Sequence, residues 1–329
     1  MEWLAEYGLF LAKTATIVLA VGAVAVILVS AGRRGRRSTG EGLEVTNLND
    51  KYQRMSRIIK QALLPKKAFA KLTKQDKSEK KKKHKSAEQD KQRVFVIDFH
   101  GDIKASAVAS LREEITAVLT EASQQDEVVV RLVNAGGLVH EHGLGASQLE
   151  RVRKRGVPLT VAVDKVAASG GYLMACVADK IIAAPFAIIG SIGVLAQLPN
   201  FNRLLEQHGV DFEQFKAGEL KRTVTMFGKN TNEDRARMQE HLEEIHALFK
   251  GFVAKYRPSL DLANVATGEY WLGSQALERG LIDDITTSDD YLTQAAETAN
   301  VYQVKYVARK RLGERVLSAV DKGLANFWR

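Results

Sequence analysis

The chain has 329 residues, 45% of them hydrophobic and 26% charged, so it can bury a globular core and still carry additional segments. Its formal net charge is +9, but much of the excess lies before residue 94 instead of being spread over the chain. Cys176 is the only cysteine, which excludes an intrachain disulfide, and no Cys/His spacing resembles a zinc site. We expect no metal and no other cofactor.

The amino terminus predicts one transmembrane helix. Residues Thr14 to Ala31 run for 18 positions without a charge, about the minimum length that spans a bilayer core. A cleaved signal peptide is the alternative, but it needs positive charge before the apolar run, whereas Glu2 and Glu6 precede it and a cluster of arginines at 33–37 follows it. The positive-inside rule then places the remainder of the chain on the cytoplasmic side.

Residues 32–93 are predicted to form a lysine-rich linker. The stretch from Lys66 to Arg93 has few large apolar side chains, so burial cannot offset the entropy of ordering it. A solvated spacer is the simplest interpretation, and adhesion of the lysines to anionic lipid headgroups is a sharper one. No aromatic residues are interleaved for base stacking, so we expect no nucleic-acid partner.

From residue 94 the pattern alternates between strands and helices. Strands are predicted at 94–99, 127–133 and 158–164, and helices at 106–123 and 146–156. This alternation indicates an α/β fold with a mainly parallel sheet covered on both faces. The uncharged stretch 181–199 contains Pro185, Gly190 and Gly193, and we interpret it as buried strand and loop instead of a second transmembrane helix.

Two glycine-containing junctions follow predicted strands, at 134–137 and at 167–172. Ser169 stands where a strand gives way to a helix, and an N–H at a helix start is free to face an anion. A nucleophilic serine there would have Gly170 as one oxyanion donor and Gly136 or Gly137 as the other. A tight structural turn is the alternative interpretation.

The residues alone leave the general base open. No histidine has a spacing that argues for a triad, and His140 and His142 are expected in a solvated loop, with metal binding as the alternative. A lysine can also serve as base when burial favours its neutral form. Lys216 and Lys221 both lie in a loop-like, glycine-containing stretch.

Four ordered motifs, Asn-Ala-Gly-Gly at 134–137, the segment from Ala168 to Val194, Lys-Ala-Gly-Glu-Leu-Lys at 216–221 and the segment 267–284, resemble the S49 family of serine peptidases, the signal peptide peptidase A group. The resemblance covers about residues 94–295. It implies a ClpP/crotonase-like fold and a Ser-Lys dyad whose members meet across a subunit interface. The family's nucleophile falls on Ser169, its base on Lys221, and a serine that orients the lysine on Ser191. Gly170 and Gly137 are the implied oxyanion donors. Family members commonly have Ser-Pro where this chain has Asn134 and Ala135.

These observations predict four segments: a membrane-anchored start at 1–31, the linker at 32–93, the peptidase domain at 94–300, and an amphipathic tail at 301–329. The tail has an apolar helical face suited to a membrane surface, an oligomer contact or packing on its own domain; this face consists of Leu312, Val316, Leu317, Val320, Leu324 and Phe327. The predicted function is a homo-oligomeric serine endopeptidase of the bacterial inner membrane that cleaves signal peptides or other apolar, unfolded peptides. A catalytically inactive membrane-anchored scaffold of the same fold is the alternative.

Overall fold

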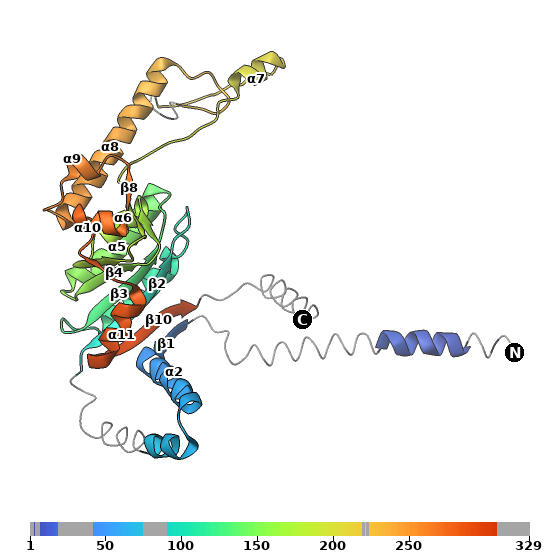
Figure 1. Ribbon diagram of the computed structural model, residues 1–329. Helices are drawn as coiled ribbons and strands as arrows, with labels where there is room; N and C mark the ends of the chain where they lie inside the picture. The colour runs from blue at the N-terminus through green and yellow to red at the C-terminus, as the bar shows by residue number, and fades with distance from the viewer. Residues whose placement is uncertain are drawn as a thin grey trace. The chain divides into compact units, whose positions relative to one another are not determined.

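The computed structural model describes residue 3 and residues 7–18, 42–74, 91–218, 221 and 224–307. Val45–Lys305 form one compact unit, built on a seven-stranded sheet of order β1-β10-β2-β3-β4-β6-β9 and a three-stranded sheet of order β5-β7-β8 (Figure 1). The strands are β1 (Gly42–Asn47), β2 (Arg93–His100), β3 (Glu127–Val133), β4 (Leu159–Val163), β5 (Val166–Ala168), β6 (Lys180–Ala183), β7 (Ile188–Gly190), β8 (Tyr270–Leu272), β9 (Asp284–Ile285) and β10 (Asn300–Val307). The helices are α2 (Leu48–Leu63), α4 (Val108–Glu121), α5 (Val139–Lys154), α6 (Gly170–Ala175), α7 (Asn202–Gln207), α8 (Asn232–Tyr256), α9 (Leu262–Val265), α10 (Gly273–Glu278) and α11 (Ser288–Thr298).

The large sheet is parallel wherever its strand pairing is defined, from β10 through β2, β3, β4 and β6 to β9. Its central strands are rich in valine and isoleucine and almost wholly buried, as expected for a sheet covered on both faces. The predicted α/β class and the three predicted central strands are therefore confirmed.

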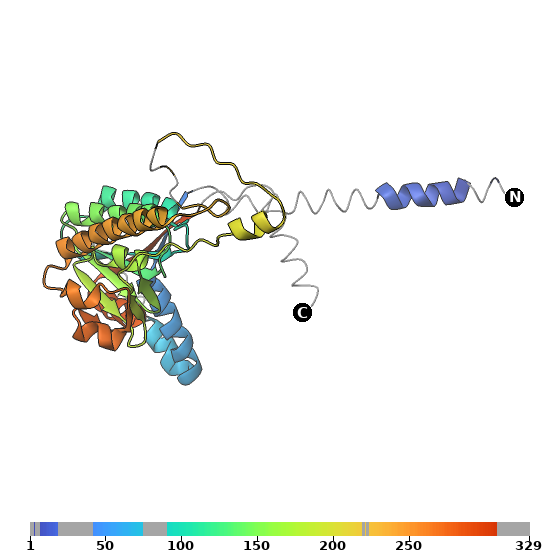
Figure 2. The ribbon, with the colours of Figure 1, turned by 90° about the horizontal axis from the view of Figure 1, so that it is seen from above.

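Alternate residues of β2 enter two different cores, because successive side chains of a strand point to opposite faces. Phe95, Ile97 and Phe99 join the large core, to which α4, α5, α6 and α8 contribute. Val94 and Val96 join a smaller core with Leu48 of α2, Leu292 of α11 and Val301 of β10. Figure 2 shows α4, α5 and α8 in a layer on one side of the sheet. The parallel strands thus bring their carboxyl ends, and the loops that follow them, to one edge.

The second predicted helix was placed too late in the chain. We expected a loop up to residue 145 and a helix from 146, but α5 begins at Val139. Its first turns contain Gly143 and Gly145, which disfavour helix locally. Packing overrides this preference, since a Cβ at Gly145 would lie only 2.9 Å from the Met174 sulfur.

The segment predicted as a linker contains regular structure at its start. Gly42–Asn47 form β1 at the edge of the large sheet, and α2 follows with its amino terminus capped by the Asn47 side chain. Residues 75–90, the most lysine-rich part, lie outside the described residues. The predicted membrane span is also mostly outside them: residues 7–18 are helical, and 19–41 are not described. Within the described part of the chain, no helix combines the length and apolar character needed to cross a bilayer.

Two further expectations concern the carboxyl-terminal half. The uncharged stretch 181–199 is strand and loop, as predicted, with β6 and β7 at its start. The predicted boundary at residue 300 coincides with the start of β10 (Asn300–Val307), whose pairing with β2 joins residues about two hundred positions apart. The predicted amphipathic helix from 308 onward lies outside the described residues.

Candidate active site

Ser169 occupies a sharp turn between β5 and α6. Its backbone has φ 52° and ψ −120°, a conformation that costs a non-glycine residue about 1–3 kcal/mol. The surroundings hold it there: the Ser169 N–H donates to the Gly190 carbonyl at 2.8 Å, and the Leu173 N–H donates to the Ser169 carbonyl at 2.9 Å. The predicted strand-to-helix junction is confirmed. Because α6 has six residues, the turn itself contributes more to the site than a helix dipole does.

Glycines let the loop after β3 approach this turn. Gly136 has φ +90°, and a Cβ added to it would lie 2.7 Å from the Ser169 Cβ and 2.9 Å from the Gly170 nitrogen. A Cβ at Gly171 would lie 2.1 Å from the Asn134 carbonyl oxygen. Such contacts are possible only without a side chain. The predicted pairing of the two glycine junctions is therefore a real juxtaposition.

Asn134 connects the two junctions from inside the protein. Its backbone bridges to β5, since the Asn134 N–H donates to the Val166 carbonyl at 2.8 Å and the Ala168 N–H donates to the Asn134 carbonyl at 3.0 Å. Its Oδ1 accepts from the Gly136 N–H at 2.9 Å, and the side chain is buried. In this chain the hydrogen bond to Asn134 Oδ1 restrains the glycine turn. In the more common Ser-Pro sequence, the fixed φ of the proline would restrain the same turn.

The expectation that His140 and His142 lie in a solvated loop was wrong. Both lie in the first turn of α5, and His142 is completely buried. Its Nε2 is 3.1 Å from Asn134 Oδ1, and its Nδ1 is 2.9 Å from the Leu138 carbonyl oxygen. Among the described residues, no group of three or more metal-ligating side chains gathers here or elsewhere.

Ser191 follows the end of β7 as Ser169 follows the end of β5. β5 and β7 are parallel with Ala168 opposite Gly190, so the two serines occupy the next matching positions. Ser191 shares the unusual backbone of Ser169, with φ 50°. Its Oγ donates to the Gly268 carbonyl at 3.3 Å, and its N–H donates to the Glu269 carbonyl at 2.7 Å.

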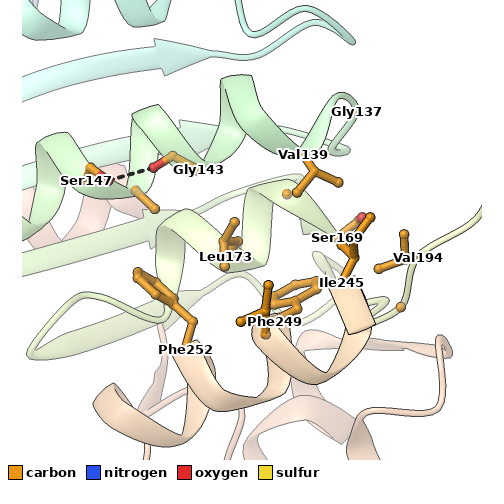
Figure 3. A pocket seen from close by; sticks show the side chains of 14 residues that line it. Gly137, Val139, Gly143, Ser147, Ser169, Leu173, Val194, Ile245, Phe249 and Phe252 are labelled. Atoms are coloured by element: carbon orange, nitrogen blue, oxygen red, sulfur yellow. Dashed lines mark hydrogen bonds between the residues drawn. The ribbon is translucent and has the colours of Figure 1, made fainter. Parts of the chain in front are cut away.

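Ser169 opens onto an apolar pocket of about 410 Å³ (Figure 3). Gly137 and Gly170 line the pocket together with the serine, and α8 provides the facing wall through Ile245, Leu248, Phe249 and Phe252. No charged side chain is found among the described residues that line it. His246 of α8 approaches the Ile192 carbonyl, with 3.2 Å between Nε2 and O, which fixes this wall next to the strand that carries Ser191. The arrangement has room for an extended chain with apolar side chains beside the Ser169 hydroxyl.

The structure does not bring either candidate lysine into this pocket. Lys216 and Lys221 are both exposed and are absent from its lining. They belong to a projecting segment, of which residues 200–218, 221 and 224–228 are described (Figure 1). Its two ends are joined by the Asn200 side chain, which donates to the Thr225 carbonyl at 2.9 Å, and by a stack of Phe201 on Phe227. Among the described residues, the site of a single chain therefore contains Ser169, Gly170, Gly137 and the adjacent Ser191, and neither candidate lysine lines it.

Comparison with known proteins settles the family. The model described as "Peptidase family S49 N-terminal" matches residues 2–149, and the model "Peptidase family S49" matches residues 151–302. The chain belongs to peptidase family S49. It is 46% identical to "Probable protease SohB" of Haemophilus influenzae over 98% of this chain and 95% of that protein. It is 51% identical to a protein of the same name from Buchnera aphidicola of Acyrthosiphon pisum, over 71% and 70% of the two chains. These matches show that this S49 member is a peptidase.

Among solved structures, the S49 chain resembles the 1510-N membrane-bound stomatin-specific protease, as a lysine-to-alanine mutant in complex with a substrate peptide. The two chains share 14% identity with a TM-score of 0.44, over 70% of this chain and 98% of the other.

Two features of the site were not predicted from the sequence. The α8 wall was missed because its apolar residues lie some 75 positions after Ser169 and carry only an ordinary helical pattern. The buried pair of Asn134 and His142 was missed because asparagine is mostly exposed in proteins and histidine is only intermediate in burial. A signal was present: Asn134 stands next to the paired glycines, where a side-chain acceptor can reach an N–H two residues later.

Proposed function

We propose that this S49 peptidase is a membrane-anchored serine endopeptidase in which Ser169 is the nucleophile and Lys221 the general base. The observation that carries the proposal is the strained turn of Ser169 at the mouth of an apolar pocket. A conformation that costs energy persists only where the surroundings enforce it, and such positions concentrate at active sites. Here the close approaches at Gly136 and Gly171 and two backbone hydrogen bonds enforce it.

The chemistry follows from these groups. Neutral Lys221 takes the hydroxyl proton as Ser169 Oγ bonds to the peptide carbonyl carbon, and the lysine then gives this proton to the departing amine as the C–N bond breaks. Water hydrolyses the resulting ester and regenerates the serine. The Gly170 N–H, the first of α6, has no acceptor within its helix and is assigned to the developing oxyanion, with the Gly137 N–H as second donor. Ser191, beside Ser169, is assigned to orient the lysine.

A second copy of the chain is proposed to supply the lysine. Lys221 is exposed, and so is Phe215 six residues earlier, with 91% of its surface accessible. Leu195, at the root of the projecting segment, is 74% exposed. Apolar side chains this exposed favour association. Burial of Lys221 against the pocket of a neighbouring copy would favour its neutral form, which is the form that a base requires.

Substrate and location complete the proposal. A pocket lined by phenylalanine, leucine, isoleucine and valine side chains suits apolar segments of unfolded chains, such as signal peptides. The uncharged run at 14–31 is proposed as a single anchor in a bacterial inner membrane, with the arginines at 33–37 favouring a cytoplasmic peptidase domain.

Hydrolysis of apolar peptides and unfolded protein by the detergent-solubilised oligomer tests the proposal. We expect the wild type to cleave, and Ser169→Ala and Lys221→Ala to form intact oligomers without activity. Arg203→Ala, in the same projecting segment as Lys221, is the matched control and should retain activity. If Ser169→Ala and Lys221→Ala cleave as fast as the wild type, the Ser-Lys dyad is refuted. If none cleaves, an inactive oligomeric scaffold becomes the better account.

A further inference from the structure

Helix α2 uses its apolar face only in part. Leu48, at its start, is buried and Tyr52, one turn later, is partly buried; both pack in the small core that includes Leu292 of α11. The same face continues toward the carboxyl end of the helix at spacings of three and four residues. There it carries four exposed side chains, which we call the α2 stripe: Met55, Ile58, Ile59 and Leu63, between 53% and 76% exposed. Figure 1 shows the carboxyl-terminal half of α2 pointing away from the sheet.

The rest of this helix and the residues that follow it are strongly cationic. Residues 51–74 contain eight lysines and arginines and no aspartate or glutamate. The eight are Lys51, Arg54, Arg57, Lys60, Lys66, Lys67, Lys71 and Lys74. Four of them lie on α2 itself. Because residues advance by about 100° each around a helix, Arg57 and Lys60 lie on the side away from the stripe, Arg54 lies at the edge of the stripe, and Lys51 lies on its face. A face of large apolar side chains opposite a face of lysine and arginine is the pattern of helices that lie in a membrane interface.

We infer that the α2 stripe lies on the surface of an anionic lipid bilayer. Contact with a second copy of the same helix is a poorer explanation, because it would bring Lys51 and Arg54 of both copies together with no acidic residue in 51–74 to pair with them. A lipid surface accepts both parts of the helix: the apolar stripe enters the acyl boundary, and the cations face anionic headgroups. The α2 stripe would then attach the domain to the membrane at a second place, separate from the predicted span at 14–31. This attachment does not depend on the chemistry proposed for Ser169.

The single cysteine permits a position-specific test on the full chain. Cys176 is completely buried, and burial raises the pKa of its thiol, so it reacts slowly with labelling reagents. Ile59→Cys then places an environment-sensitive fluorophore on the stripe, and Gln53→Cys places the same fluorophore on the cationic side of the same helix. Both labelled chains are reconstituted into vesicles of phosphatidylcholine alone, or of equal parts phosphatidylcholine and phosphatidylglycerol.

The proposal expects a blue shift of the label at 59, and its quenching by spin-labelled lipid, in the anionic vesicles only. The label at 53 should stay in a water-like environment, and the charge reversal Arg54→Glu, Arg57→Glu, Lys60→Glu should abolish the shift at 59. Met55→Cys provides a second stripe position should Ile59→Cys fold poorly. Equal spectra at 59 and 53, or at 59 in both lipids, overturn the proposal. Protection at 59 that depends on protein concentration in detergent overturns it in favour of a second copy, and protection only on adding a soluble acidic protein overturns it in favour of a protein partner. Because the readout is fluorescence, the membrane-contact proposal can fail while peptidase activity is present. Equally, the peptidase proposal can fail while the label at 59 reports contact with lipid.

Discussion

Replacing Asn134 with leucine tests whether the buried amide positions the glycine turn beside Ser169. The substitution keeps the number and branching of the side-chain heavy atoms but removes Oδ1, which accepts from the Gly136 N–H at 2.9 Å and lies 3.1 Å from His142 Nε2. Two buried polar groups then lose their partner, at about 1–3 kcal/mol each. We expect the free energy of unfolding to fall by about 4 kcal/mol, the middle of that range for the pair.

The effect on catalysis should be separable from the effect on stability. If the turn moves, the Gly137 donor leaves the oxyanion position, and losing one such donor lowers kcat by about 10²–10³-fold. KM should change little, because the α8 wall of the pocket is untouched. The assay is steady-state hydrolysis of an apolar fluorogenic peptide by the solubilised oligomer, with denaturant unfolding in parallel.

A matched rescue sharpens this test. Asn134→Ser combined with Ala135→Pro installs the Ser-Pro sequence common in the family, where a fixed φ replaces the hydrogen bond. It should recover most of the kcat lost in the leucine variant. A leucine variant that turns over at the wild-type rate would refute the positioning role of Asn134.

Three further predictions concern separate contacts. Gly136→Ala should abolish activity, because its Cβ would meet Ser169 at 2.7 Å, whereas Gly251→Ala, where no atom lies within 4 Å, should leave hydrolysis unchanged; equal activity of the two would contradict the close approach. Phe252→Glu places a charge in the uncharged pocket and should lower kcat/KM for apolar peptides roughly tenfold, measured against a lysine-containing peptide that should lose less. Although burial opposes ionisation, hydrogen bonds from Arg93 and Ser123 lower the pKa of Asp126 to about 2. Its ionised form therefore stabilises the fold by about 2 kcal/mol above pH 4, a contribution lost as the pH falls toward 2. Asp126→Asn should lower the unfolding free energy by that amount at pH 7 and by much less at pH 2.5, and a pH-independent difference would count against the ion pair.

Local sequence patterns predicted those elements whose burial can be recognised from a run of neighbouring apolar residues. β3 was placed correctly because seven residues rich in valine are buried on both faces. The turn at Ser169 was placed because small residues and glycines interrupt two apolar runs. The start of α5 was not predicted, because two glycines there disfavour a helix. Tertiary contacts stabilise it instead: Gly145 packs on Met174, and His142 contacts Asn134.

Long-range pairing accounts for most of the remaining differences. β10 has a mixed sequence with Gln303 and Lys305, and it becomes a strand by pairing with β2, which no local pattern reports. α2 was hidden in a cationic region, although its apolar spacing is helical and Leu48 packs in the core. For the site, the sequence placed Ser169, Gly137 and Gly170 around one point, and a single chain does not supply Lys221 to it.

Activity of mixed oligomers tests the central claim most directly, namely that Ser169 of one copy works with Lys221 of another. Ser169→Ala and Lys221→Ala chains are inactive alone in this account, and they are dissociated, mixed in equal amounts and reassembled. An interface that pairs Ser169 from the lysine variant with Lys221 from the serine variant is intact, so hydrolysis should reappear at about one quarter of the wild-type rate if copies assort randomly. A mixture that assembles normally and remains inactive would contradict the shared Ser-Lys site.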